Sequence, residues 1–264
     1  MAYLGIDIGS LSCDAVILDD IGNILASAVV PTGAKNIEAI ERATREVLDL
    51  AGISKDQIRS TVSTGYGRDR VAERSAAVTE ITCHAKGILK FYPQTNILID
   101  IGGQDSKVIQ IGPKGKVMDF SMNDKCAAGT GRFLEAMART LEVDLEDMAQ
   151  LDQGAQGKVT ISSMCTVFAE SEVVSLIAQG AEIREIVFGL NRSIGSRTNS
   201  LAKRFLSTNG ENHLAMSGGV ARNQGVVRAL GGLFGKEILV PEQPDIIGAL
   251  GAALIAMEND QENS

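Results

Sequence analysis

The stretch LGIDIGSLSCDAVIL (Leu4–Leu18) decides the fold, because it reads as a buried strand, a glycine turn and a second strand. LIDIGGQDSKVIQI (Leu98–Ile111) repeats this order of elements later in the chain, and each first strand carries an aspartate, Asp7 or Asp100, near its end. A third strand and an amphipathic helix follow each hairpin, at 24–30 and 37–51, then at 117–120 and 129–141. Repetition of a whole unit of three strands and a helix predicts a duplicated α/β fold.

Composition agrees with an α/β protein. Aromatic residues make up only 4% of the 264 residues while glycine occurs 28 times, which suits many tight turns between strands and helices. The net charge of −8 disfavours nucleic acid as a partner, because its phosphates would be repelled. No apolar segment reaches the roughly 18 residues of a membrane span, and no basic leader precedes the first strand. We therefore expect a cytoplasmic protein with neither nucleic acid nor a membrane as a partner.

The two glycine turns are candidate phosphate sites. Glycines let the backbone approach phosphate oxygens, and successive N–H groups in a turn form a concave anion site. The aspartate beside each turn would hold Mg²⁺, directly or through water. A third turn, SGGVARN (Ser217–Asn223), joins a predicted strand to a helix and would receive the nucleoside. The predicted nucleotide-binding residues are Gly9, Ser10, Leu11, Ser12, Gly102, Gly103, Gln104, Gly218, Gly219 and Asn223.

Cys126 and Cys165 are the candidate metal ligands. Each precedes a predicted helix, in NDKCAAGTGRF and SSMCTVFAESE, and helix N-termini stabilise thiolates. Cys13 falls inside the first hairpin and Cys83 inside a predicted helix beside His84, so neither is expected to bind metal. A four-iron cluster needs four cysteines, and two chains that meet about a two-fold axis would supply them. Zinc on the same thiolates, a buried cysteine at each position and a redox-sensing thiol are the alternatives.

The set of two hairpins and one glycine turn resembles the superfamily of acetate and sugar kinases, Hsp70 and actin. GALGAA (Gly248–Ala253) is similar to the second interdomain helix of that superfamily. The resemblance implies two ribonuclease-H-like domains with an ATP cleft between them. We expect residues 1–95 with 246–260 to form the first domain, and residues 96–245 to form the second, which carries both candidate cysteines. The chain has no Walker sequence and no GxGxxG after its first strand, which disfavours P-loop and Rossmann proteins.

The cysteine segments narrow the resemblance further. Together with TGYGR (Thr64–Arg68), CHA (Cys83–Ala85) and DIGGQDSK (Asp100–Lys107), they resemble the ATP-dependent activators of 2-hydroxyacyl-CoA dehydratases and the related ATPase subunits of benzoyl-CoA reductase. This resemblance spans nearly the whole chain. It implies ATP or ADP and Mg²⁺ as ligands, and one [4Fe–4S] cluster that Cys126 and Cys165 of two chains hold in a homodimer.

The same resemblance implies the activity. Members of this family hydrolyse ATP and donate one electron to an iron–sulfur dehydratase or reductase, after receiving it from a donor such as ferredoxin or flavodoxin. In this chain Asp7 and Asp100 would act on Mg²⁺ or the attacking water, and Gln104 would orient the water or the γ-phosphate. Asp14 stands where family members often have a lysine. A small-molecule kinase with a structural metal or none is the alternative; an Hsp70-like regulator would need a peptide-binding domain, for which no length remains.

Overall fold

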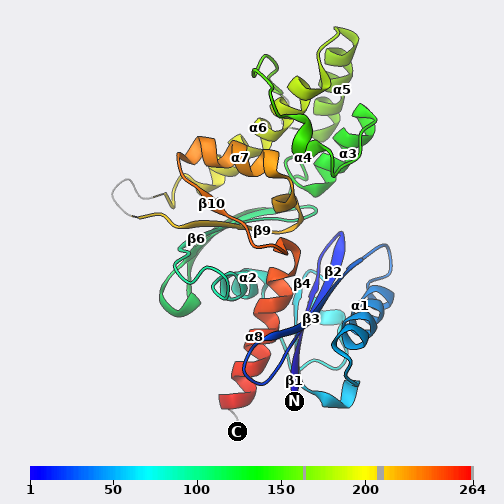
Figure 1. Cartoon of the computed structure of the whole chain (residues 1–264), viewed down its shortest axis with the longest axis vertical. Coiled ribbons are helices and arrows are strands. Elements are labelled where there is room, and N and C mark those ends of the chain that lie inside the picture. The colour runs from blue at the N-terminus through cyan, green and yellow to red at the C-terminus, as the bar shows by residue number, and fades with distance from the viewer. Residues whose placement is uncertain (163–164, 207–210, 263–264) are drawn as a thin grey trace. The chain divides into compact units, whose positions relative to one another are not determined.

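The computed structural model describes residues 1–162, 165–206 and 211–262. Ser163 and Met164, which belong to the second cysteine segment, lie outside the described residues. The chain forms two compact units (Figure 1). Unit 1 comprises residues 1–98, 109–120 and 241–264, and unit 2 comprises residues 99–108 and 121–240.

The first sheet has the strand order β3-β2-β1-β4-β5. Its strands are β1 (Ala2–Ile8), β2 (Ser12–Leu18), β3 (Ile24–Pro31), β4 (Ile58–Gly65) and β5 (Ala76–Ala77). The β1–β2 and β2–β3 pairs are antiparallel, as the predicted hairpins require, whereas β1 and β4 run parallel. The parallel β4 places the end of a strand that is distant in sequence beside Asp7 at the end of β1.

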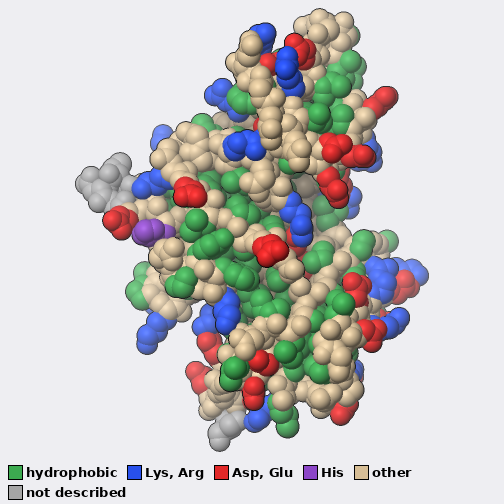
Figure 2. Space-filling view, in the orientation of Figure 1, with side chains coloured by type: hydrophobic (Ala, Val, Ile, Leu, Met, Phe, Trp, Pro, Cys, Tyr) green, Lys and Arg blue, Asp and Glu red, His purple; other side chains and the backbone are tan. Residues whose placement is uncertain are grey.

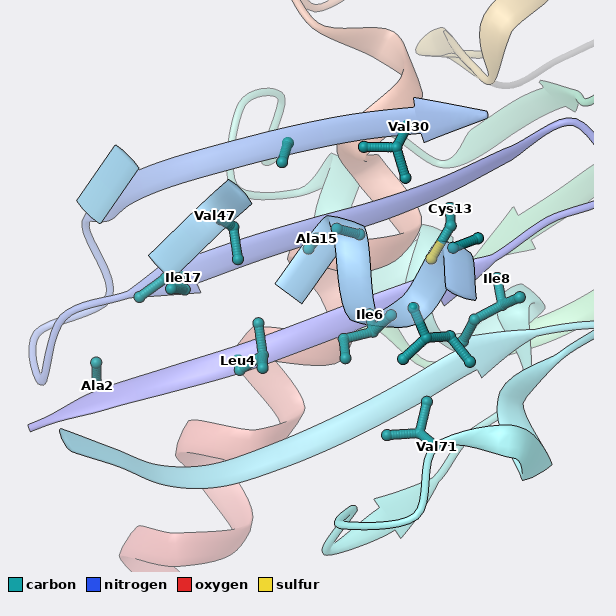
Figure 3. Close-up of a cluster of buried hydrophobic side chains, with 14 residues drawn as sticks. Ala2, Leu4, Ile6, Ile8, Cys13, Ala15, Ile17, Val30, Val47 and Val71 are labelled. Atoms are coloured by element: carbon teal, nitrogen blue, oxygen red, sulfur yellow. The ribbon is translucent and has the colours of Figure 1, made fainter. Parts of the chain in front are cut away.

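Helix α1 (Asn36–Ala51) covers one face of this sheet, and α8 (Ile247–Glu262) packs on β1, β2 and β4 from the other face, where α2 (Glu80–Ile88) contacts it (Figure 1). Alternate residues of β1 from Ala2 to Ile8 point into a hydrophobic cluster with the buried side of α1 (Figure 3). Since side chains alternate along a strand, Asp7 points to the opposite face, toward α8.

The second sheet has the order β10-β9-β6-β7-β8. Its strands are β6 (Ile97–Ile101), β7 (Ser106–Ile111), β8 (Val117–Asn123), β9 (Leu214–Ser217) and β10 (Ile238–Leu239). Read in reverse, this order matches the first sheet strand for strand: β8, β7 and β6 correspond to β3, β2 and β1, and β9 and β10 correspond to β4 and β5. The predicted duplication is therefore confirmed.

Five helices accompany the second sheet among the described residues: α3 (Gly131–Leu141), α4 (Met148–Leu151), α5 (Thr166–Ala178), α6 (Ile183–Ala202) and α7 (Gln224–Phe234). Helix α5 packs on α3 and α6, and α6 packs on α7. Gly180, which lies between α5 and α6, has a φ of +80°. The predicted helix at 129–141 begins only at Gly131, so the loop after β8 continues through Thr130.

Candidate functional site

The first hairpin turns tightly at its glycine. The N–H of Gly9 donates to the carbonyl of Ser12 over 2.9 Å, which closes the turn between β1 and β2. Thr32 at the end of β3 anchors the turn, since its N–H donates to the Leu11 carbonyl and its hydroxyl to the Gly9 carbonyl. The predicted residues Gly9, Ser10, Leu11 and Ser12 thus form one compact loop, with the N–H of Gly9 already used inside the turn.

Asp7 is a buried carboxylate at the mouth of this hairpin. Its Oδ2 lies 3.5 Å from Nε2 of His84, which is also buried and comes from α2. Helix α8 passes directly behind the pair, and a Cβ on Gly248 would overlap Oδ2 of Asp7. His84, for which the sequence suggested only a core or interface role, is therefore a neighbour of the predicted Mg²⁺-binding aspartate.

Asp14 lies directly opposite Asp7 in the β1–β2 register. Both side chains are buried, and the hydroxyl of Ser12 donates to Oδ2 of Asp14 over 3.0 Å. Two carboxylates on facing strand positions repel each other at neutral pH unless a proton or a cation lies between them. This hairpin therefore carries two buried acids at positions where a lysine at position 14 would leave one acid and one base.

The second hairpin repeats the turn but reverses the charge. Gly102 donates to the carbonyl of Asp105 over 3.0 Å, as Gly9 does to Ser12. Lys107, which occupies the position equivalent to Asp14, reaches Oδ2 of Asp100 at 3.2 Å and Oδ1 of Asp105 at 2.8 Å. All three side chains are buried. The predicted catalytic Asp100 is thus held in a buried ion-pair network, and Gln104 lies exposed at the tip of the turn.

The glycine turn after β9 (Ser217–Asn223) lies against Asp100. The hydroxyl of Ser217 donates to Oδ1 of Asp100 over 2.9 Å. Gly218 has a φ of +82°, and a Cβ there would overlap the carbonyl of Ile101, so only glycine fits. The first half shows the same arrangement, because Gly65 after β4 also has a φ of +82° and abuts Asp7. The structure therefore brings Asp100, the second hairpin and the predicted nucleoside turn together.

Gly219 begins a short 3₁₀ turn, and Asn223, the last predicted nucleotide-binding residue, caps the helix that follows. Its Oδ1 accepts hydrogen bonds from the N–H groups of Gly225 and Val226 at the start of α7. Its Nδ2 lies 3.4 Å from Oδ1 of Asn191 on α6, and Nδ2 of Asn191 donates to Asp152 over 2.9 Å. The nucleoside turn is thereby tied to α6 in the interior of unit 2.

The loop of the second hairpin is also bonded to the start of α3. The carbonyl of Gly102 accepts from the N–H of Gly131, and the carbonyl of Gly103 accepts from the N–H of Arg132, each over 2.9 Å. The hydroxyl of the buried Thr130 lies 2.8 Å from the Gly103 carbonyl. Since the loop 124–130 carries Cys126, the predicted phosphate loop and the first candidate cysteine share one hydrogen-bonded segment.

The two candidate ligand cysteines are both exposed. Cys165 is the N-cap residue of α5, and its carbonyl accepts from the N–H of Ala169, as predicted for a residue at a helix start. Cys126 also precedes its helix, but α3 begins five residues later, at Gly131, and the carbonyl of Cys126 accepts from Nδ2 of Asn123. Its thiol is therefore placed by a loop, not by a helix dipole.

The other two cysteines are unsuited to bind metal. Burial raises the pKa of the Cys13 thiol to about 12, and the carboxylates of Asp14 and Asp7 act in the same direction. Burial also raises the pKa of the Cys83 thiol to about 12. Because thiolates are the metal-binding form, only Cys126 and Cys165 fit a thiolate-bound group. Among the described residues no cluster of three or more metal-binding side chains has the geometry of a site, so a single chain offers two thiols.

Several residues of these sites were not among the predicted ones. Lys107 had a sequence signal, because it follows Asp100 at the same interval at which Asp14 follows Asp7. His84 approaches Asp7 from α2, and Asn191 reaches Asn223 from α6, through tertiary contacts that no local pattern announces. Among the described residues, no helix has the length and apolar character needed to cross a membrane.

Comparison with known proteins agrees with this architecture. Residues 4–256 match the model of the BadF/BadG/BcrA/BcrD ATPase family. The chain is 47% identical to the activator of lactoyl-CoA dehydratase from Anaerotignum propionicum, over 99% of this chain and all of that protein. It is 43% identical to the (R)-2-hydroxyglutaryl-CoA dehydratase activating ATPase of Acidaminococcus fermentans, over 96% of each.

A solved structure shares the fold along the full length. The activator of the 2-hydroxyisocaproyl-CoA dehydratase from Clostridium difficile, solved with bound ADPNP, superposes with a TM-score of 0.93 at 42% identity, and covers 100% of this chain and 97% of that one. The predicted ribonuclease-H-like fold of the actin and Hsp70 type is thereby confirmed. The chain belongs to the BadF/BadG/BcrA/BcrD ATPase family.

Proposed function

We propose that this protein is an ATP-hydrolysing one-electron donor that activates an iron–sulfur dehydratase or reductase. Family membership supports ATP hydrolysis, and the full-length similarity to proteins named as dehydratase activators supports the activator role. The electron would come from a small low-potential carrier such as ferredoxin or flavodoxin. We place this reaction in the cytoplasm.

For the nucleotide, we propose that the two hairpin loops bind the phosphates and that the Ser217–Asn223 turn binds the nucleoside. Asp7 and Asp100 would hold Mg²⁺ or orient the attacking water, with Gln104 beside the γ-phosphate. The buried positions of both aspartates support this role, because a buried carboxylate retains its charge only with a counter-charge. Lys107 supplies the counter-charge to Asp100, and Mg²⁺ would supply it to Asp7 and Asp14.

For the domains, we propose residues 1–95 with 246–260 and residues 96–245. All strands of the first sheet fall within the first range and all strands of the second sheet within 96–245. Helix α8 packs on β1, β2 and β4, which supports counting 246–260 with the first range. Each proposed domain is then one sheet with its covering helices.

For the redox site, we propose that Cys126 and Cys165 of two copies hold one [4Fe–4S] cluster. When bound, such a cluster supplies one-electron transfer at a potential that its surroundings set. The donor set fits, since these two thiols are exposed while Cys13 and Cys83 are buried with raised pKa values. Two thiols from each chain complete the four that the cluster requires.

An exposed apolar surface supports the homodimer. Val167 and Phe168, which follow Cys165 on α5, are 65% and 67% exposed, and Val174 and Ile177 of the same helix are also exposed. Hydrophobic side chains are visible over the α5 region of unit 2 in Figure 2. Burying this apolar surface in a second copy would bring two Cys165 thiols into one environment and remove the apolar side chains from water.

The observation that carries the proposal is the bonding of the second hairpin loop to the cysteine loop. A nucleotide that moves Gly102 and Gly103 also moves Thr130, Gly131 and Arg132, because the carbonyls of the former accept their hydrogen bonds. Cys126 lies in the segment that ends at Thr130. The state of the nucleotide can therefore change the position of a cluster ligand without an intervening element.

Anaerobic purification followed by iron, sulfide and mass analysis tests this proposal. We expect about four irons and four sulfides per dimer, and loss of both from Cys126→Ser and from Cys165→Ser, with ATP hydrolysis retained in the iron-free protein. Cys13→Ser serves as the control and should keep its iron. Protein that holds zinc, or that binds no metal and phosphorylates a small metabolite, would contradict the proposal.

A further inference from the structure

Arg197 lies beneath the loop that carries Cys126. It is a half-buried residue on α6, the helix that also contacts α5. A Cβ built on Gly129 would lie 3.2 Å from Cδ of Arg197 and 4.0 Å from Cα of Ile194, so the loop passes directly over this part of α6. The aliphatic part of the Arg197 side chain therefore lies next to Gly129 of the cysteine loop.

The charge of Arg197 acts on both candidate ligands. Burial lowers the pKa of its guanidinium, and the thiols of Cys126 and Cys165 act in the opposite direction. The two cysteines belong to segments that are far apart in the sequence, yet one guanidinium lies within electrostatic range of both. Arg197 thus lies against the loop that carries Cys126 and interacts electrostatically with both thiols.

Other charged residues of the Cys126 segment are engaged at the surface. Lys125 pairs with Asp124 over 3.1 Å, and the side chain of Lys125 is almost fully exposed. Arg132 pairs with Glu135 on the next turn of α3 over 3.2 Å. Exposed ion pairs contribute little to the potential at a neighbouring site, because water and salt screen them. A half-buried arginine is screened less and acts more strongly on the thiols.

We propose that Arg197 is the charge-compensating residue of the cysteine site, which favours the more negative, reduced state of the group that Cys126 and Cys165 bind. This inference rests on the proposed function, because it assumes that the bound group takes up an electron. Uptake of one electron from the carrier adds one negative charge at the site and makes or breaks no bond. A fixed positive charge stabilises the state with the additional electron and so raises the reduction potential.

The test compares Arg197→Gln, Arg197→Lys and the matched control Arg192→Gln. Arg192 lies on the same helix, is exposed, and has its guanidinium carbon 5.9 Å from the centre of the Phe188 ring. The substitution Arg192→Gln therefore removes one positive charge from α6 at a position away from the cysteine loop. Each protein is titrated anaerobically, and the reduced form is followed by electron paramagnetic resonance. Circular dichroism and nucleotide affinity check that the fold is intact.

We expect Arg197→Gln to show, at a fixed applied potential, a ratio of reduced to oxidised protein about tenfold lower than wild type, which corresponds to about 59 mV for one electron. Arg197→Lys should restore most of the ratio and Arg192→Gln should leave it unchanged. A folded Arg197→Gln that binds no iron supports the proposal if Arg197→Lys does bind it.

Two outcomes overturn the inference: a wild-type ratio in iron-loaded Arg197→Gln, or loss of iron from both folded variants, which would assign Arg197 a packing role. Neither outcome affects the proposed function. A wild-type protein without iron and sulfide would instead refute the proposed function itself, so the two failures are distinguishable.

Discussion

At the scale of single residues, the two halves differ most at one pair of equivalent positions. Lys107 pairs with the buried Asp100, whereas Asp14 faces the buried Asp7. The same backbone therefore carries a neutralised carboxylate in one hairpin and a carboxylate pair in the other. This difference predicts that the second hairpin is stable without ligand, while the first hairpin gains stability when it binds Mg²⁺.

Replacement of Lys107 by Met tests the buried network. The change leaves Asp100 and Asp105 in the interior without their cation, so the free energy of unfolding should fall by about 3–5 kcal/mol. Urea unfolding in the absence of nucleotide measures it. Lys116→Met, at an exposed position, is the control. An unfolding free energy within about 0.5 kcal/mol of wild type would show that the network does not stabilise the fold.

Thiol reactivity tests the division of the four cysteines into two exposed candidate ligands and two buried residues. In metal-free protein at pH 8, Cys126 and Cys165 should react rapidly with a thiol reagent, because both are exposed. Cys13 and Cys83 have pKa values of about 12 and are buried, so almost none of either is thiolate and both should react only after unfolding. Peptide mapping after brief labelling identifies the modified residues. Rapid labelling of Cys83 would contradict the assignment.

At the scale of elements, helices α3 and α6 of the described part of unit 2 link the turns that we propose to bind nucleotide to the cysteine segment. The start of α3 donates hydrogen bonds to the second hairpin loop, and α6 carries both Asn191, bonded to the nucleoside turn, and Arg197, beneath the cysteine loop. Two separate elements thus connect the same pair of sites. Rigid elements with contacts at both sites are the kind of connection through which binding at one site alters another.

Thr130→Val tests the connection through α3. Its hydroxyl lies 2.8 Å from the Gly103 carbonyl and 2.6 Å from the Ala127 carbonyl, so valine removes the side-chain tie between the hairpin loop and the cysteine loop. We expect the difference in reduction potential between the ADP-bound and ATP-bound protein to shrink at least twofold, a loss of coupling in the range of tenths to about 2 kcal/mol. Anaerobic redox titration with each nucleotide measures it.

Thr140→Val is the matched control for this experiment. Thr140 lies on the same helix, and its hydroxyl lies 3.0 Å from the Ala136 carbonyl and 3.2 Å from Oε1 of Glu170 on α5, so the control removes side-chain bonds of α3 other than those to the hairpin loop. The control should retain the wild-type nucleotide response. If Thr130→Val also responds like wild type, the Thr130 hydroxyl does not carry the coupling.

The elements show which parts of the fold were predictable. Both hairpins followed from the alternation of apolar residues around an aspartate and a glycine. Strand β4 was not predicted, because it contains the polar residues Ser60, Ser63 and Thr64, all of which are buried. The hydroxyl of Ser60 lies 3.0 Å from that of Ser75, and the hydroxyl of Ser63 donates to the Arg68 carbonyl. A strand with a polar interior face gives no amphipathic signal.

The candidate site was predictable to the extent that its residues are local. The turns, the paired aspartates and the two exposed cysteines could be named from short segments. His84 beside Asp7 and Arg197 beside Gly129 could not, because helices that are distant in sequence bring them there. The start of α3 at Gly131, two residues later than predicted, was also missed, since Gly131 and Arg132 bond to the hairpin loop and set where that helix begins.

At the scale of the whole molecule, the chain consists of two similar halves that differ in the surface features they carry. The same arrangement of five strands occurs twice, and the central strand of each sheet carries a buried aspartate next to its last residue. Only the second half carries the exposed cysteines and the exposed apolar side chains of α5. We propose that the second half alone builds the redox site and the dimer surface.

The most direct test of the central claim is the transfer of one electron to the iron–sulfur dehydratase or reductase encoded beside this protein. The protein is reduced, mixed anaerobically with that enzyme, and the reduced partner is quantified by electron paramagnetic resonance. With ATP and Mg²⁺ we predict up to one electron transferred per dimer, and almost none with ADP or a non-hydrolysable ATP analogue. Equal transfer without ATP, or ATP hydrolysis with no reduction of any such partner, would contradict the account.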